Sequence, residues 1–435
     1  MSRISEIINI LNTLPKGYIS KKTINNKVYY YLQYLSNGKL ISEYIKHSEL
    51  ETIKNKLTKR KQLEEELESI FTSGKSLKIP SNYSKNLTGQ LMSMDKVVAS
   101  FKDGELKYVD EKLCPLFILR TNNIRHFLAS RAIDSSRANS RLLKKALNIN
   151  EKEDEIVSLY SHGATITDTY WFKAKGSKLK YEDIRFDNNI YSDLALNGEL
   201  IVYPKIPRLT PELTTPGSYE KCWKKINDEW WLYKKGNQEE IFSELFCSEL
   251  AFLLNIPTAS YEYIDGVIRT RNFAIKYNFE PMTSIAGDDD SYEHVFNLLY
   301  SINKKLAKEY ILLMWFDVLV NNVDRHNENC GLLRNRKTGD IVCLAPNFDN
   351  NLALISRSKI LNMDASKDGF INVFIKFLKK NENAYKIYKD IKLPKLNAKT
   401  INECFKVIEI KQDEDMIRKY LLNRYSYLIY FQQKQ

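Results

Sequence analysis

Two carboxylates and one side-chain amide stand in this sequence in a pattern that suits phosphoryl transfer. Asp324 and Asn329 lie in a polar turn that follows an apolar helical pattern over residues 310–320. Asp349 follows a short apolar strand pattern over residues 341–344. Phosphoryl transfer from ATP needs one carboxylate to orient the attacking hydroxyl, and an amide with a second carboxylate to hold magnesium. The three side chains supply that set.

The elements around these residues would hold them at the ends of rigid segments. Four residues separate Asp324 from Asn329, which is the spacing of the catalytic loop of protein kinases. A hairpin with residues 337–340 at its tip is expected between the polar turn and Asp349. Both acidic residues would therefore follow an element whose end fixes the backbone.

A second group of residues upstream could bind the phosphates of a nucleotide. Small residues let backbone N–H groups approach a phosphate, and a loop of such residues between two expected short strands holds Thr214, Thr215, Pro216, Gly217 and Ser218. A strand over residues 229–234 ends at Lys234, and a helix over residues 238–254 carries Glu244. Each feature alone is more often an ordinary loop, an exposed lysine or a solvated glutamate. Their order, with a hairpin at Asp265-Gly266 behind them, is that of a kinase N-lobe, in which the lysine holds the α- and β-phosphates and the glutamate pairs with it.

The composition is that of a globular chain with more than one domain. Its 435 residues, 43% hydrophobic and 12% aromatic, allow two or three domains with their own cores. The six cysteines are scattered without a Cys-x-x-Cys pair, which favours reduced thiols over structural zinc. No apolar run approaches the ~18 residues of a membrane-spanning helix, and the N-terminus lacks the features of a signal peptide. We therefore expect a cytoplasmic protein without membrane contact.

The N-terminal 80 residues carry half of the net positive charge. They hold 14 Lys and Arg and 8 Asp and Glu, and the chain carries +12. Strands over residues 27–34 and 39–45 are joined at Asn37-Gly38, a strong hairpin signal, and a charged helix is expected over residues 48–71. This segment contains a cluster of tyrosines, namely Tyr29, Tyr30, Tyr31 and Tyr34. They could form a stacking platform for bases, but we prefer the interpretation that they line a half-buried face of the sheet. The segment is expected to be a small module that binds nucleic acid or a protein partner.

The rest of the chain shows mixed patterns. A polar linker is expected over residues 72–86, followed by a hairpin that turns at Asp103-Gly104. Helical patterns cover residues 124–132, 136–147 and 151–159, and an aromatic section over residues 167–203 is expected to be irregular. Residues 366–435 repeat apolar side chains at helical spacing and end in an amphipathic helix over residues 416–431.

Four short runs of this sequence resemble a known family. The runs NVDRHNEN at residues 322–329 and LAPNFD at residues 344–349 are similar to motifs of the HipA-like serine/threonine kinases of bacterial toxin–antitoxin systems and of their relative, the cell-translocating kinase A. The run ELFC at residues 244–247 resembles the N-lobe helix of that family, and GSYEKCW at residues 217–223 resembles its phosphate loop. The resemblance covers residues 205–435.

This resemblance implies a two-lobed kinase fold, a need for ATP and Mg²⁺, and phosphorylation of serine or threonine residues in proteins. Matched by position, Asp324 would be the catalytic base, and Asn329 and Asp349 would be the magnesium ligands. Lys234 would be the ATP lysine in preference to its neighbour, since strand alternation turns only one of the two inward. His326 occupies a motif position to which no role is assigned beyond the structure of the loop.

The resemblance also implies self-regulation through the phosphate loop, together with an antitoxin protein as a partner. Members of the family can phosphorylate a serine in this loop, and the matching position here is Thr214, with Ser218 as a second acceptor. The chain departs from the family in having threonine at that position and Glu220 where proline is usual. The loop residues expected to bind ATP are Thr214, Thr215, Gly217, Ser218 and Lys221.

We therefore expect an α+β chain with a two-lobed protein-kinase-like fold, a β-rich N-lobe and a helical C-lobe, and a small additional α+β module at the N-terminus. The expected domains are a basic module over residues 1–73, a middle α+β region over residues 88–204 that packs on the N-lobe or forms part of it, the N-lobe over residues 205–285 and the C-lobe over residues 286–435. The preferred function is that of a Ser/Thr protein kinase. A small-molecule phosphotransferase and a nucleic-acid-binding regulator with a kinase-like fold are the alternatives.

Overall fold

The chain divides into two compact units. The computed structural model describes residues 6–7, 10–11, 13–24, 27–36, 39–72, 87–102, 105–150, 152–199, 209–356 and 361–434. The first unit comprises Met1–Ser84, Leu128–Ala164 and Leu179–Trp231, and the second comprises Lys85–Phe127, Thr165–Lys178 and Leu232–Gln435. Each unit is described by itself below.

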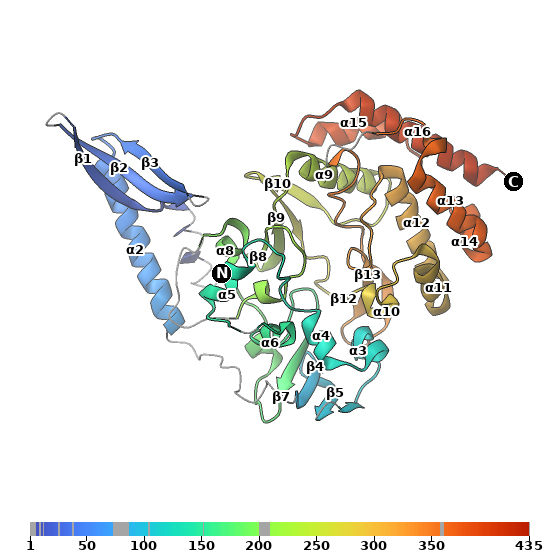
Figure 1. Cartoon of the computed structure of the whole chain (residues 1–435), viewed down its shortest axis with the longest axis horizontal. Helices are drawn as coiled ribbons and strands as arrows, with labels where there is room; N and C mark the ends of the chain where they lie inside the picture. Colours follow the sequence, from blue (N-terminus) through green and yellow to red (C-terminus); the bar gives the residue numbers. More distant parts are fainter. Residues whose placement is uncertain are drawn as a thin grey trace. The chain divides into compact units, whose positions relative to one another are not determined.

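The first unit begins with a three-stranded antiparallel sheet. The strands β1 (Tyr18–Ile24), β2 (Lys27–Ser36) and β3 (Lys39–Ile45) pair in chain order, and the helix α2 (Leu50–Thr72) follows them (Figure 1). The two predicted strands and the charged helix are confirmed, and β1 is a strand that the sequence pattern did not indicate. The predicted turn at Asn37-Gly38 and residues 73–86 of the predicted linker lie outside the described residues.

Short helices and the expected phosphate loop complete the first unit. These elements are α5 (Ser140–Ala146), α6 (Asp154–Leu159), α7 (Tyr181–Ile184), α8 (Ser192–Asn197), the 3-10 helix η1 (Pro211–Thr214) and β8 (Lys221–Ile226). The helix α4 (Ile124–Ala129) and the strand β9 (Glu229–Lys234) each have residues in both units.

Two expectations for this part of the chain are wrong. The strand expected before the phosphate loop is the 3-10 helix η1, because Thr210 caps it by accepting from Glu212 N at 3.2 Å and Pro211 occupies its first position. The section over residues 167–203, expected to be irregular, contains α7, α8 and the strand β7 (Tyr170–Ala174). The helices α7 and α8 have 4 and 6 residues, too few to show the apolar repeat by which a helix is recognised in a sequence.

Three sheets supply the strands of the second unit. The first has the order β6-β5-β4-β7, the second includes β10, β11 and β9 in that order, and the third has the order β12-β13-β14. Their further strands are β4 (Gly89–Ser93), β5 (Lys96–Lys102), β6 (Glu105–Tyr108), β10 (Tyr261–Ile264), β11 (Val267–Arg271), β12 (Tyr277–Pro281), β13 (Gly331–Asn335) and β14 (Ile341–Leu344). Asp265 and Gly266 have φ of 48° and 81°, which confirms the predicted hairpin turn between β10 and β11. The turn predicted at Asp103-Gly104 lies outside the described residues.

The helices of the second unit enclose its largest apolar core. They are α3 (Leu116–Thr121), α9 (Gln238–Leu253), α10 (Thr283–Ala286), α11 (Tyr292–Ile302), α12 (Lys304–Val320), η3 (Ala365–Lys367), α13 (Gly369–Lys380), α14 (Glu382–Asp390), α15 (Ala398–Val407) and α16 (Glu414–Gln433). The core runs from α9 through α12 to α16. Phe405 of α15 packs between Phe242 and Phe246 of α9, at ring distances of 6.4 and 5.1 Å. The helical C-terminal part is therefore as predicted.

The chain is a mixed α+β protein, which confirms the predicted class. Its described helices include none that is both long enough and apolar enough to cross a lipid bilayer.

Candidate active site

The polar turn (residues 321–329) begins where α12 ends. Asn321 has a φ of 58°, the left-handed conformation that asparagine tolerates and that commonly ends a helix. Arg424 of α16 donates from Nε to the carbonyl of Val318 at 2.9 Å, which satisfies one of the last carbonyls of α12. The turn therefore starts from a helix end that is fixed in the core.

Arg325 joins the polar turn to the helix before it. Its Nε and Nη2 donate to the two carboxylate oxygens of Asp317, at 3.0 and 2.9 Å. The side chains of this pair are 3% and 1% exposed. Burial alone would lower the pKa of Arg325, but Asp317 beside it raises the pKa, so the guanidinium stays charged. Such a buried pair is favourable only when its remaining donors are also satisfied.

The remaining donors of Arg325 hold a second segment, the aspartate loop (residues 345–351), against the polar turn. Nη1 donates to the carbonyl of Asn329 at 2.6 Å and to that of Phe348 at 2.5 Å. Nη2 also donates to Oδ1 of Asn347 at 2.6 Å and to Oδ1 of Asn350 at 2.9 Å. One buried guanidinium therefore contacts the two segments that carry the predicted acidic residues.

Asp324 and Asn329 contact each other across the polar turn. Asn329 donates from Nδ2 to the carbonyl of Asp324 at 3.0 Å and lies 3.5 Å from its Oδ2. These contacts use the nitrogen of the amide, whereas its oxygen is the atom that can bind a metal ion. His326 is exposed, and its Nδ1 accepts from the backbone N–H of Glu328 at 3.2 Å. The contact described for His326 thus shapes the turn.

Lys234 and Asp349 form an ion pair. Lys234 is the last residue of β9 and is buried, whereas Lys235 is half-buried. Asp349 has a φ of 59°, which is uncommon for a residue with a Cβ and costs backbone strain. Strain of this kind persists only where the surrounding contacts enforce it, and the aspartate loop is held by Arg325.

Glu244 of α9 lies fully buried beside this ion pair. Its Oε1 accepts from the backbone N–H of Asn350 at 2.8 Å, and its Oε2 is buried without a hydrogen-bond partner among the described residues. Burial raises the pKa of Glu244 to about 7, while Lys234 opposes the shift and Asp349 adds to it. Lys234 also lies close enough to Glu244 to lower the pKa of Glu244, and the pair of these two residues that was expected from the sequence stays a prediction. The half-buried Asp349 is the better anion, because Glu244 is fully desolvated.

The structure brings five predicted residues into one site of the second unit: Lys234, Glu244, Asp324, Asn329 and Asp349. Sequence reasoning missed the residues that hold them, because it assigned no role to Arg325, Asp317 or Asn350. One signal was present in the sequence. Asp317 is a lone carboxylate in the apolar stretch LLMWFDVLV of α12, where a buried charge needs a partner.

The donor set of this site suits a magnesium ion. The carboxylate of Asp349 and the amide oxygen of Asn329 are hard oxygen ligands, and Mg²⁺ in phosphoryl-transfer sites is commonly held by one or two protein groups together with phosphates and water. The Asp349 carboxylate already neutralises a cation, the ammonium of Lys234. Both observations fit a site at which positive charge is bound.

The expected phosphate loop belongs to the first unit, where a buried ion pair holds it. Glu212 and Arg137 are both fully buried, and Nη2 of the arginine lies 2.5 Å from Oε2 of the glutamate. Oε1 of Glu212 accepts from the backbone N–H of Trp223 at 2.7 Å, after the loop. Nη1 of Arg137 donates to the carbonyl of Thr215 at 3.3 Å, within the loop. The pair thus fixes the chain on both sides of residues 216–220, and no sequence pattern predicts it.

The hydroxyl groups of the loop differ in their accessibility. Thr214 is buried, and its Oγ1 donates to the carbonyls of Ala164 at 2.8 Å and Pro211 at 3.1 Å. Ser218 is exposed. Gly217 has a φ of 94°, and a Cβ at this position would overlap the side chain of Lys221. In this conformation Ser218 presents its hydroxyl to solvent, and Thr214 does not.

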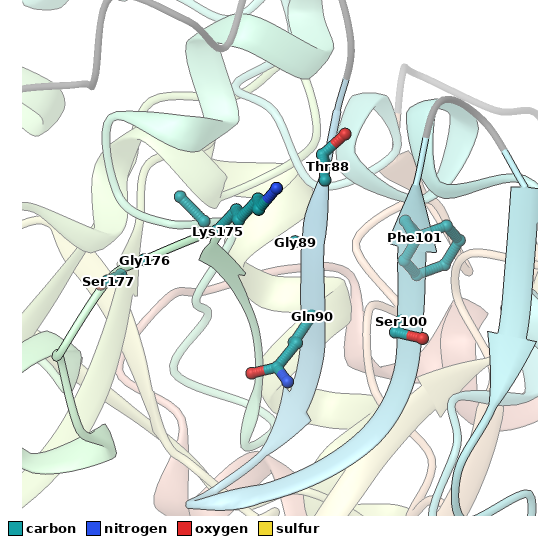
Figure 2. Close-up of a pocket in the computed structure, with 9 residues that line it drawn as sticks. Thr88, Gly89, Gln90, Ser100, Phe101, Lys175, Gly176 and Ser177 are labelled. Atoms are coloured by element: carbon teal, nitrogen blue, oxygen red, sulfur yellow. The ribbon is translucent and has the colours of Figure 1, made fainter.

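A pocket of about 270 Å³ lies on the sheet of β4, β5 and β7 in the second unit. Figure 2 shows Thr88, Gly89 and Gln90 along one strand, with Ser100 and Phe101 along its neighbour. Ala174, Lys175, Gly176 and Ser177 complete the lining. None of these residues is among the predicted site residues, and the lining holds one lysine and no carboxylate, so it does not supply the donor set described above.

Comparison with known families places two parts of the chain. Residues 208–409 match the HipA-like C-terminal domain, and residues 2–55 match a domain of unknown function, DUF6788. No curated protein matches the sequence. The first match includes all five residues of the site, and it confirms the resemblance to HipA-like proteins.

Two solved structures are similar to the chain at low identity. The proinflammatory kinase CtkA of Helicobacter pylori is 19% identical, with 49% of this chain and 92% of the other covered and a TM-score of 0.39. The toxin–antitoxin structure from Shewanella oneidensis MR-1, which contains HipA, HipB and operator DNA, gives 14% identity, coverage of 79% and 95%, and a TM-score of 0.46. The likeness is remote, and the roles of the site residues rest on the geometry of this chain.

Proposed function

We propose that this chain is a kinase that uses ATP and Mg²⁺ to phosphorylate serine or threonine side chains of a protein, a proposal that the match of residues 208–409 to the HipA-like C-terminal domain supports. The observation that carries the proposal is the guanidinium of Arg325, which holds the polar turn with Asp324 and Asn329 against the aspartate loop. The fold that this function requires is a two-lobed kinase fold, with the nucleotide between the lobes.

In the proposed reaction, Asp324 accepts the proton of the attacking hydroxyl group. The hydroxyl oxygen forms a bond to the γ-phosphorus while the bond from that phosphorus to the bridging oxygen breaks, and ADP leaves with the electron pair. Lys234 binds the α- and β-phosphates. Asn329 and Asp349 would hold Mg²⁺, which would supply positive charge to neutralise the charge that develops on the phosphates.

The ion pair of Lys234 implies an exchange of partners when the nucleotide binds. Lys234 would leave Asp349 for the phosphates, which frees the carboxylate for Mg²⁺. Glu244 is close enough for Lys234 to act on its pKa, and its Oε2 has no hydrogen-bond partner among the described residues. Glu244 can therefore take over as the carboxylate that orients Lys234.

Self-phosphorylation would fall on Ser218 in preference to Thr214. Ser218 is exposed and can accept phosphate without unfolding of the loop, whereas both acceptors of the Thr214 hydroxyl lie in the buried interior. Mass spectrometry of the protein after incubation with ATP and Mg²⁺ should find phosphate on Ser218. Phosphate on Thr214 alone would show that the loop opens before it reacts.

The cellular role that goes with this chemistry is that of a toxin controlled by an antitoxin protein in the cytoplasm. All six cysteines are free thiols, which suits a reducing compartment. Induced expression of the wild-type chain should stop bacterial growth, and expression of the Asp324→Asn variant at the same level should not. Equal toxicity of the two chains would contradict a role through phosphorylation.

The experiment that tests the proposed activity is transfer of labelled phosphate from ATP to protein. The full-length chain is incubated with Mg²⁺ and γ-labelled ATP, beside Asp324→Asn and a control substitution of the exposed Val323→Ala in the same turn. Label on the wild type and on Val323→Ala, but not on Asp324→Asn, is expected. Turnover of ATP without any labelled protein would instead indicate a small-molecule phosphotransferase.

A further inference from the structure

One face of the N-terminal sheet gathers tyrosine and lysine side chains. Residues directly opposite in an antiparallel pair share a face, as does every second residue along a strand. The register pairs Lys22 with Tyr29 and Tyr31 with Tyr44. The surface that follows from this register, here called the tyrosine face, comprises Tyr18, Lys22, Lys27, Tyr29, Tyr31 and Tyr44.

The opposite face of the sheet is partly buried, whereas no described side chain of the tyrosine face is buried. Leu32 and Ile45, on the opposite face, are 8% and 2% exposed. Tyr18 and Tyr44, on the tyrosine face, are each 57% exposed. Tyr29 and Tyr31 are half-buried, as predicted. The solvent-facing side of such a sheet normally carries polar residues, so two tyrosines that are more than half exposed on this side need another explanation.

The rings of the tyrosine face lie close enough to form one surface. The ring of Tyr44 is 6.2 Å from that of Tyr29 and 5.8 Å from that of Tyr31. Nζ of Lys22 lies 4.9 Å from the centre of the Tyr31 ring. The face therefore combines aromatic rings with an ammonium group at their edge.

The positive charge of the N-terminal segment is concentrated on this sheet. The sequence from Tyr18 to His47 holds five lysines and one carboxylate, whereas α2 holds five cationic and five acidic residues. The one carboxylate is Glu43, which accepts from the hydroxyl of Tyr34 at 2.6 Å on the opposite face. The tyrosine face thus carries lysines without a compensating acid, as a surface for a polyanion does.

We propose that the tyrosine face binds a single-stranded nucleic acid. Aromatic rings on an exposed sheet bind bases by stacking, and lysines beside them contact the phosphates. The bases of a duplex are already stacked on each other and cannot use the rings, so the aromatic part of the surface favours a single strand. The groups that this face recognises are bases and phosphates. RNA and DNA share these groups, so the proposal covers a single strand of either. The inference does not depend on the proposed kinase activity.

The test measures binding of fluorescein-labelled oligonucleotides to the full-length protein, without ATP, by fluorescence anisotropy. The probes are a 20-nucleotide oligouridylate, a 20-nucleotide oligothymidylate and a 20-base-pair duplex. Binding of at least one single strand, more tightly than the duplex, is expected. Tighter binding of the duplex, or no binding of either single strand, would overturn the proposal.

Substitutions on the face separate stacking from charge. Tyr31→Leu/Tyr44→Leu should weaken binding about tenfold or more, and Tyr31→Phe/Tyr44→Phe should retain it, because phenylalanine keeps the ring. Lys22→Gln/Lys27→Gln should reduce the slope of log K against log salt by about 1.4. Lys56→Gln/Lys59→Gln changes two exposed lysines of α2 and removes the same charge, so it is the matched control.

Two outcomes decide the assignment of the surface. Unchanged affinity of the leucine variant, with an unfolding midpoint equal to that of the wild type, would overturn it. Equal effects of the two lysine pairs would also overturn it, because binding would then follow net charge alone. The leucine variant should transfer phosphate at the wild-type rate, so that a failure of this proposal is distinct from a failure of the proposed kinase activity.

Discussion

Arg325 binds both carboxylate oxygens of Asp317 at 3.0 and 2.9 Å. The same guanidinium donates to the carbonyls of Asn329 and Phe348. A residue of the polar turn thus links the core helix α12 to the two segments proposed to bind Mg²⁺. Because six hydrogen bonds meet at this one buried group, a change at Arg325 should act on metal binding as well as on stability.

Arg325→Lys should raise the Mg²⁺ concentration needed for half-maximal activity, because lysine cannot bridge the two loops. The matched control is Arg334→Lys, which breaks another buried arginine–carboxylate pair of the second unit, with Glu280 at 2.6 Å. Both variants keep the positive charge but lose hydrogen bonds of the guanidinium, so both should lose unfolding free energy, about 1.5–3 kcal/mol for each charged hydrogen bond that lysine does not replace. An equal Mg²⁺ requirement in the two variants would show that Arg325 acts only on stability.

Lys234→Met should strengthen the binding of Mg²⁺ in the absence of nucleotide and weaken the binding of ATP. The ammonium of Lys234 competes with Mg²⁺ for the carboxylate of Asp349, and it is also the proposed ligand of the phosphates. Isothermal titration calorimetry with each ligand separately measures the two effects. Lys235→Met is the control and should change neither. Weaker Mg²⁺ binding in Lys234→Met would contradict the competition.

Glu244 should make the unfolding free energy depend on pH in the range between 4.5 and 7. Its pKa is about 7 in the folded chain against the ordinary value of 4.5, because burial favours the protonated form. A raised pKa contributes stability that is complete below pH 4.5 and is lost as pH rises through 7. Glu244→Gln, which cannot ionise, should therefore gain about 3 kcal/mol relative to the wild type between pH 4.5 and pH 8.

Urea unfolding of both proteins at a series of pH values, in EDTA and without nucleotide, measures this difference. A difference between the two proteins that stays constant with pH would show that the carboxyl group of Glu244 ionises as an exposed one does.

Glu212→Gln should destabilise the first unit, because it leaves the buried guanidinium of Arg137 without its carboxylate. The expected loss is about 3–5 kcal/mol of unfolding free energy. Glu182→Gln, an exposed glutamate of the same unit, should leave the unfolding midpoint unchanged. Limited proteolysis should in addition cut the Glu212→Gln variant within residues 216–220. A wild-type cleavage pattern would contradict the view that this pair holds the loop.

The local elements could be predicted from the sequence because their signals are local. Residues 341–344 are β14 as predicted, and the helix expected over residues 238–254 is α9. The strand β1 was missed because its residues, YISKKTI, alternate without a clear apolar face. The helix η1 was missed because its signal is a cap, Thr210 before Pro211, within a run that otherwise suits a strand.

The contacts that hold the site could not be predicted in the same way. Arg137 and Glu212 lie 75 residues apart in the chain, and nothing in a single sequence indicates that they form a pair. The acidic residues could be selected as candidates from their type and spacing alone. The ion pair of Lys234 with Asp349 could not be predicted, because the sequence does not contain the burial of Asp349 and Glu244.

The most direct test of the central claim is the single-turnover rate of γ-phosphate transfer by the wild type and by Asp324→Asn, with the affinity for ATP and Mg²⁺ measured in parallel. The site predicts that Asp324→Asn binds the nucleotide as the wild type does and transfers phosphate about 10²–10⁴-fold more slowly, because the group that accepts the proton is lost. Transfer by Asp324→Asn at the wild-type rate would show that the polar turn is not the catalytic loop of a kinase.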